Sequence, residues 1–217
     1  MDLLLHAHSP FALLGLVHIG NRVWQSAQIR RDIPWDVSVS FSKVSPHHRG
    51  WLVSVSVNAS QRGVTVYQAT SEYLARANHQ LEVEREAAAA LPASVTQLAA
   101  LPAKASIGRI YAGVSGDYNP IHLSMLGAKL FGFPRAIAHG MWSLASSYAL
   151  IAKAHMPHGN RDVTLTNQFV RPMLLPGEGK LFVARHGDGN GNFAFCLSGV
   201  AMEPGKEHLN GQVLWAS

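Results

Sequence analysis

A short polar segment holds residues whose types could act together in chemistry. Asp117 and His122 stand five positions apart in the run Gly-Asp-Tyr-Asn-Pro-Ile-His, residues 116–122. A carboxylate and an imidazole that converge on one water can exchange protons with it near neutral pH, as hydration of a double bond requires. The same residue types also favour a plain Asx turn at Asp117 or Asn119, followed by an exposed histidine. The spacing alone leaves both interpretations open.

A second candidate stands where an apolar helix is expected to begin, in the run Ala-His-Gly-Met, residues 138–141. Backbone N–H groups at a helix N-terminus lack partners within the helix and carry partial positive charge. Gly140 would let a thioester carbonyl approach such an N–H, which would stabilise the enolate-like oxygen formed during water addition. The alternative is a glycine that packs beneath a loop. Because alanine has the better helix propensity, Gly140→Ala is expected to be nearly harmless to the helix.

The elements that position these residues differ along the chain. Before residue 80, runs of alternating β-branched and polar residues predict an antiparallel meander with one buried face, with strands at 37–41, 51–57 and 63–67. Residues 81–104 are rich in alanine and contain Pro92 and Pro102, a composition typical of a linker.

The remaining residues, 105–217, mix strands with helices. A strand is expected at 107–111, a short helix near 124–130, and a longer helix at 140–154. This longer helix carries no charge before Lys153 and is expected to be buried nearly all round. Further strands are expected at 162–170, 179–184, 193–197 and 211–215. A buried helix wrapped by an antiparallel sheet belongs to the α+β class.

Composition narrows the possible partners. The formal net charge is +5, but the basic residues are scattered, which disfavours nucleic acid and favours a small anionic molecule. Cys196 is the only cysteine, so no intrachain disulfide can form, and its apolar neighbours predict a buried thiol. No run approaches the roughly 18 apolar residues that span a bilayer, and the N-terminus is a poor signal peptide. We therefore expect a cytoplasmic protein without a membrane partner.

Taken with its surroundings, the polar segment resembles the MaoC-like dehydratase family, which includes the R-specific enoyl-CoA hydratases and has the hotdog fold. The resemblance rests on the Asp, Asn, Pro and His of residues 116–122, on Gly-Phe-Pro at 132–134 and on His-Gly-Met at 139–141. It covers about residues 105 to 175. The resemblance implies that the catalytic residues are Asp117, His122 and Gly140, and that the substrate-binding residues are Asn119, His139 and Met141.

Residues 9–21 have a weaker resemblance to the non-catalytic first unit of double-hotdog members. The expected fold is therefore a double hotdog, with an antiparallel sheet wrapped around a central apolar helix. Its parts would be an incomplete, shortened N-terminal hotdog at 1–80, a linker at 81–104 and a catalytic hotdog at 105–217. Because a shortened first half would leave a sheet edge or apolar surface uncovered, a homodimer is expected.

The function implied by the resemblance is a hydro-lyase. It would interconvert a trans-2-enoyl thioester and a (3R)-hydroxyacyl thioester carried on CoA or an acyl carrier protein, with no metal or redox cofactor. Two alternatives remain open, because a fold alone does not choose between chemistries. One is an acyl-CoA thioesterase, and the other is a non-catalytic subunit that binds acyl thioesters.

Overall fold

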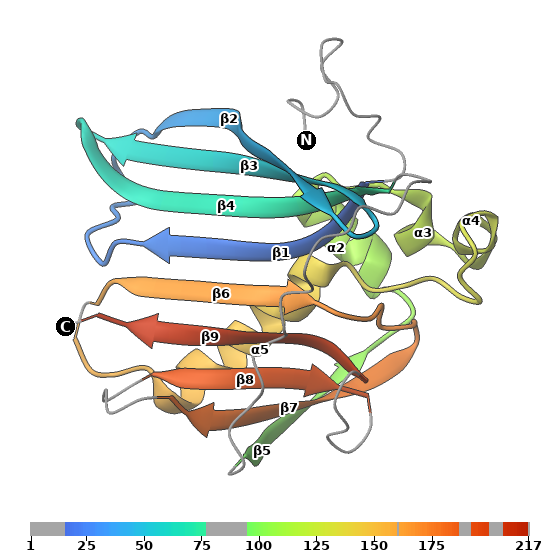
Figure 1. The fold of residues 1–217 in the computed structure, drawn as a ribbon. Coiled ribbons are helices and arrows are strands. Elements are labelled where there is room, and N and C mark those ends of the chain that lie inside the picture. Colours follow the sequence, from blue (N-terminus) through green and yellow to red (C-terminus); the bar gives the residue numbers. More distant parts are fainter. Residues whose placement is uncertain (1–15, 77–94, 160, 187–191, 200–205, 217) are drawn as a thin grey trace. The chain divides into compact units, whose positions relative to one another are not determined.

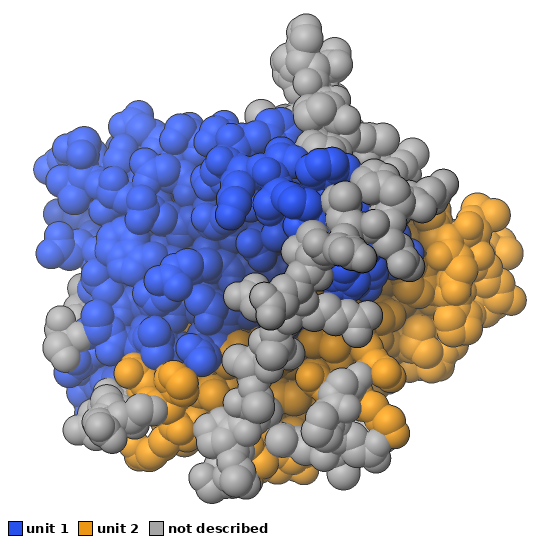
Figure 2. Space-filling view, viewed as in Figure 1, with its two compact units in different colours: residues 1–90, 157–168, 212–217 blue, residues 91–156, 169–211 orange. Residues whose placement is uncertain are grey.

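The computed structural model describes residues 16–76, 95–159, 161–186, 192–199 and 206–216 of the 217-residue chain. The chain divides into two compact units, each assembled from separate stretches of sequence (Figure 2). Unit 1 comprises residues 1–90, 157–168 and 212–217, and unit 2 comprises residues 91–156 and 169–211. No helix in the described ranges is both long and apolar enough to cross a membrane.

Unit 1 is built from strands in the order β2-β3-β4-β1-β6 (Figure 1). The strands are β1 (Leu16–Gln25), β2 (Asp36–His47), β3 (Gly50–Gln61), β4 (Val64–Arg76) and β6 (Val163–Phe169). Their pairings are antiparallel, so the predicted meander is confirmed. The sequence patterns did not predict β1, because an irregularity between His18 and Gly20 breaks its alternation.

One face of this sheet is apolar. On β3, Val53, Val55 and Ala59 are almost completely buried. The residues opposite them on β2 continue the same face, with Val37 paired to Ala59 and Phe41 paired to Val55. Val37 is nevertheless 59% exposed and Val39 is 44% exposed. The edge strand of this unit therefore presents apolar side chains to solvent.

Unit 2 combines strands with helices. Its strands follow the order β9-β8-β7-β5, and they are β5 (Thr96–Ala103), β7 (Gly177–Arg185), β8 (Phe193–Ser198) and residues 207–211 of β9 (Glu207–Trp215). Its helices are α2 (Ile107–Ser115), α3 (Pro120–Leu123), α4 (Met125–Leu130) and α5 (Gly140–His155). Every residue of β8 is buried, and α5 contacts β5. The predicted α+β arrangement of antiparallel strands and an apolar helix is confirmed.

The β8 strand contains the single cysteine in the position predicted for it. Cys196 is buried. Burial, with a smaller effect from the negative charge of Glu207, raises the pKa of Cys196 to about 12. The thiol therefore stays protonated and unreactive at neutral pH.

The strand predicted at 107–111 is wrong, because these residues begin helix α2. Gly108 and Ala112, four positions apart, are its buried residues, which is the spacing of one helix face. Gly116 ends the helix with a φ of 71°, and its N–H donates to the carbonyl of Ala112. This left-handed cap is a position that favours glycine.

The linker interpretation is wrong for residues 96–103, which form β5 and pair with β7. Pro102 is compatible with this strand because β5 is at the end of the strand order, where a proline need not donate to a neighbouring strand. Residues 81–94 of the expected linker lie outside the described residues. The expectation that the central helix is buried nearly all round is also wrong, since Ala145, Ala149 and Lys153 form an exposed stripe on α5.

Candidate active site

The loop between α2 and α3 is fixed by two successive side-chain turns. An Asp117 carboxylate oxygen, Oδ1, accepts the N–H of Asn119 at 3.1 Å, and the Asn119 amide oxygen accepts the N–H of Ile121 at 3.3 Å. Asn119 thereby caps α3, and Pro120 occupies the first turn, where its missing N–H costs nothing. The Asx turns that the sequence allowed are thus both present. They hold the loop in place, and Asn119 has this role whether or not it also binds substrate.

His122 lies on α3 and is buried, so the alternative of an exposed histidine is wrong. Its Nδ1 lies 2.9 Å from the carbonyl oxygen of Ile137. Because a carbonyl oxygen can only accept, Nδ1 must carry the hydrogen of this contact. The remaining ring nitrogen of a neutral imidazole, Nε2, then carries a lone pair and can act as a base.

Glycines let the surrounding helices approach the His122 backbone. A Cβ on Gly108 of α2 would overlap the carbonyl group of His122, and a Cβ on Gly127 of α4 would overlap that of Pro120. The Ile137 N–H also donates to the carbonyl of Ile121 at 3.1 Å. Close helix contacts and backbone hydrogen bonds therefore hold α3 in place.

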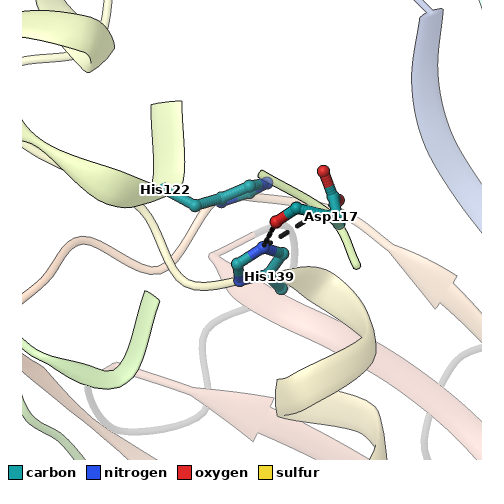
Figure 3. A group of neighbouring side chains, drawn as sticks. All are labelled: Asp117, His122 and His139. Carbon is teal, nitrogen blue, oxygen red and sulfur yellow. Dashed lines mark hydrogen bonds and ion pairs between the residues drawn. The ribbon is translucent and has the colours of Figure 1, made fainter. Parts of the chain in front are cut away.

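Asp117, His122 and His139 converge in space (Figure 3). One ligand atom from each residue lies within 4.8 Å of those from the others. A water that makes two hydrogen bonds of about 2.8 Å can bridge groups about 4.6 Å apart at a tetrahedral angle. The Asp117 side chain is 31% exposed, so the group can be reached from solvent. The separation therefore suits a single shared water.

The environment of His122 favours its neutral form. Burial first, and then the neighbouring His139, lower the pKa of His122 to about 4. The hydrogen bond to Ile137 and the negative charge of Asp117 oppose this shift and are the weaker effects. The imidazole is therefore neutral, with its Nε2 lone pair free for proton transfer, at neutral and mildly acidic pH.

His139 precedes α5 and is only 3% exposed. Its Nε2 lies 3.0 Å from the backbone carbonyl of Asp117 and 3.9 Å from the Asp117 carboxylate. Its ring stacks on the ring of His122, with centroids 3.7 Å apart. The Nδ1 atom of His139 is buried and has no hydrogen-bond partner among the residues that the structure describes.

The three side chains are poorly arranged for a metal ion. The rings of His122 and His139 are stacked at an angle of 25°. A metal lies in the plane of an imidazole, on the nitrogen lone pair, so two rings that stack face to face cannot both direct lone pairs at one ion. In addition, Nε2 of His139 and Nδ1 of His122 are already engaged with backbone carbonyls.

Gly140 is the first residue of α5, as the sequence predicts. A Cβ at this position would lie 2.9 Å from the ring of Phe169, so the expectation that Gly140→Ala is nearly harmless is wrong. This close contact supports a packing role for the glycine. Binding of a carbonyl by its N–H stays a prediction, as does substrate binding by the adjacent, half-buried Met141.

Tyr111 of α2 is a neighbour of the site that was not predicted from the sequence. Its ring centroid lies 5.1 Å from that of His139, with the planes tilted by 54°. Burial, followed by the negative charge of Asp117, raises the pKa of Tyr111. The helical spacing of Gly108 and Ala112, together with the terminating Gly116, was the signal that could have identified α2 and this tyrosine.

Comparisons with known proteins match both the motif region and the whole chain. The family described as MaoC like domain matches residues 79–192. The 3-hydroxyacyl-thioester dehydratase X of Mycobacterium tuberculosis is 34% identical over 208 residues, which are 94% of this chain and 70% of that protein. The crystal structure of HtdX of Mycobacterium tuberculosis matches with a TM-score of 0.75 and 32% identity. This match covers 100% of this chain and 82% of the HtdX chain. The peroxisomal enoyl-CoA hydratase 2 of Arabidopsis thaliana is 40% identical over 88 residues, which are 40% of this chain and 27% of that protein.

Proposed function

This chain belongs to the MaoC-like dehydratase family, and on that basis we propose that it reversibly hydrates a trans-2-enoyl thioester to a (3R)-hydroxyacyl thioester. Members of this family add water to acyl thioesters or remove it from them. The α+β hotdog fold is shared with HtdX. The acyl group would be carried on the phosphopantetheine of CoA or an acyl carrier protein, in keeping with the net charge of +5.

One observation supports this proposal most directly. The Asp117 carboxylate and the His122 imidazole come within 4.8 Å, and the Ile137 carbonyl leaves a lone pair on His122 Nε2. Two groups at this separation can hold one water and exchange its proton.

The reaction would proceed with these groups as acid and base. The water oxygen forms a bond to the β-carbon of the enoyl group, and the water proton passes to the Asp117–His122 pair. The electron pair of the double bond is held on the thioester oxygen until the α-carbon receives a proton from the same Asp117–His122 pair. Dehydration is the reverse, and the enzyme is unchanged after either direction.

The developing charge on the thioester oxygen needs a donor. We assign this role to the N–H of Gly140, one of the first groups of α5, which have no partner within the helix. A preformed donor of this kind stabilises an oxyanion more than it does the ground-state carbonyl. No sequence like that of residues 116–122 occurs before residue 80, so we assign one active site to each chain, and the first half remains a proposed non-catalytic hotdog.

Crotonyl-CoA separates this proposal from its alternatives. A hydratase removes the enoyl absorbance without releasing thiol, and chiral analysis of the product gives the (3R) alcohol. Release of free thiol with the enoyl group intact would identify a thioesterase. Binding of crotonyl-CoA without any turnover would identify a non-catalytic subunit, and either result contradicts the proposal.

A further inference from the structure

The backbone that carries His139 is fixed on two sides. The N–H of Ile137 donates to the carbonyl of Ile121 in α3, and the N–H of Ala138 donates to the carbonyl of Met173 at 2.8 Å. His139 follows directly and leads into α5. Its side chain therefore extends from an anchored backbone into the buried part of the site.

From this fixed position, the His139 ring reaches the loop between α2 and α3. Nε2 of His139 lies 3.0 Å from the carbonyl oxygen of Asp117, a residue 22 positions earlier in the sequence. Since the carbonyl only accepts, His139 donates the hydrogen. In the described residues, this is the contact that joins the Asp117 backbone to the start of α5.

The flat face of the same ring supports the other catalytic group. The His139 and His122 rings stack with centroids 3.7 Å apart, and the Tyr111 ring packs against His139 at 5.1 Å. The Ile137 hydrogen bond fixes one edge of the His122 ring, and the stack limits rotation of its plane. One residue thus contacts both members of the proposed catalytic pair (Figure 3).

We propose that His139 is a positioning residue that holds the Asp117 backbone and supports the His122 ring, and that it does not bind substrate. This inference rests on the proposed function. It replaces the expectation that His139 is a substrate-binding residue. The hydrogen bond and the stack are separate contacts, so they can be removed separately.

Two substitutions make this separation. His139→Gln keeps an N–H near the position of ring Nε2 but removes the flat ring, whereas His139→Phe keeps a ring on His122 but cannot donate. A matched control is His155→Phe, because His155, the last residue of α5, is also a histidine stacked on an aromatic ring, that of Phe193, at 4.4 Å. The control changes a stacked histidine without touching the catalytic pair.

Steady-state kinetics with crotonyl-CoA form the first readout. We expect His139→Phe to lower kcat by about tenfold, the effect of one lost hydrogen bond at the upper end of its usual range, with KM changed less than twofold. His139→Gln should keep kcat within about threefold of wild type, and His155→Phe should match wild type. A rise in KM with unchanged kcat in both His139 variants would show substrate binding and overturn the proposal.

An NMR titration of His122 without substrate is the second readout. Among the described residues, Asp117 from the loop and His139 before α5 are the ionisable side chains that act on the His122 titration, and Tyr111 on α2 packs against His139. Because the electrostatic effect of His139 lowers the pKa of His122, both His139 variants should raise that pKa, and the control should not. A purely structural role would reduce the melting temperature without moving this titration.

The two readouts keep this inference separate from the proposed function. If wild-type protein leaves crotonyl-CoA unchanged, the proposed function fails, while the His122 titration still reports the contact with His139. Folded His139→Phe protein with wild-type kcat and a wild-type His122 titration would overturn the inference even if wild type is a hydratase.

Discussion

The pH dependence of hydration should reveal the buried state of His122. If this imidazole accepts a proton from water, activity is lost as pH falls through its pKa. Burial first, and then His139, lower the pKa of His122 from 6.5 to about 4. The lone pair is therefore retained across a range of mildly acidic pH in which an exposed histidine would be protonated.

The size of the effect follows from these two pKa values. At about pH 5.5, a group with a pKa near 4 is about 97% neutral, whereas one with a pKa of 6.5 is about 9% neutral. The expected kcat/KM at that pH is thus about tenfold higher than that of an enzyme with an ordinary histidine.

The assay is hydration of crotonyl-CoA at low substrate concentration, followed from about pH 3.5 to 8 at constant ionic strength. Circular dichroism at each pH ensures that only folded protein is compared. An NMR titration of His122 assigns the acidic limb of the profile to this residue. A midpoint for His122 at or above 6.5 would refute the burial argument.

The same pKa shift predicts how the stability of the protein changes with pH. Between about pH 4 and 6.5 the unfolded chain binds a proton at His122 that the folded protein does not. The free energy of unfolding should therefore rise with pH through this window and gain nothing further from His122 above it. Urea denaturation at several pH values measures this change. The prediction is contradicted if the free energy of unfolding of the wild type falls as pH rises through this window and His122→Ala abolishes that fall.

Three further predictions concern packing and assembly. Gly140→Ala should lower both the melting temperature and turnover, because its Cβ meets the Phe169 ring at 2.9 Å; a double variant with Phe169→Ala that regains folding and also wild-type turnover would contradict the carbonyl-binding role. Gly108→Ala should destabilise the protein by about 1–3 kcal/mol through overlap with α3, whereas Gly113→Ala on the same helix, with nothing within 4 Å of its Cβ, should not; equal melting temperatures would contradict this. Because β2 exposes apolar side chains at a sheet edge, light scattering should show a dimer that Val39→Lys weakens, and a stable wild-type monomer at micromolar concentration would rule the dimer out.

The parts of the site that the sequence predicted are those encoded locally. Asp117, Asn119 and His122 lie within one short loop, whose turn residues and proline determine most of its conformation. The start of α5 at Gly140 was likewise predictable from an uncharged helical run. Short-range patterns sufficed because the decisive contacts span only a few positions.

The parts that were not predicted depend on contacts between distant residues. β5 is a strand because it pairs with β7, about eighty positions later, and its own composition resembles a linker. The run 107–111 contains two isoleucines and a tyrosine, which favour strands, yet it begins a helix whose Gly108 packs against the backbone of His122. The contact of His139 with the Asp117 carbonyl spans 22 positions, and no local pattern in the sequence indicates it.

The shared water between Asp117 and His122 is the central claim, and a double-mutant comparison tests it most directly. Turnover of crotonyl-CoA should be measured for Asp117→Asn, His122→Ala and the double variant, with the exposed residues Asp36→Asn and His158→Ala as controls. General acid–base groups contribute about 100- to 10,000-fold, so each single variant should lose at least about 100-fold. The double variant should be little less active than the less active of the two single variants, because both groups act on one water. Near-wild-type turnover in either folded single variant would contradict the account.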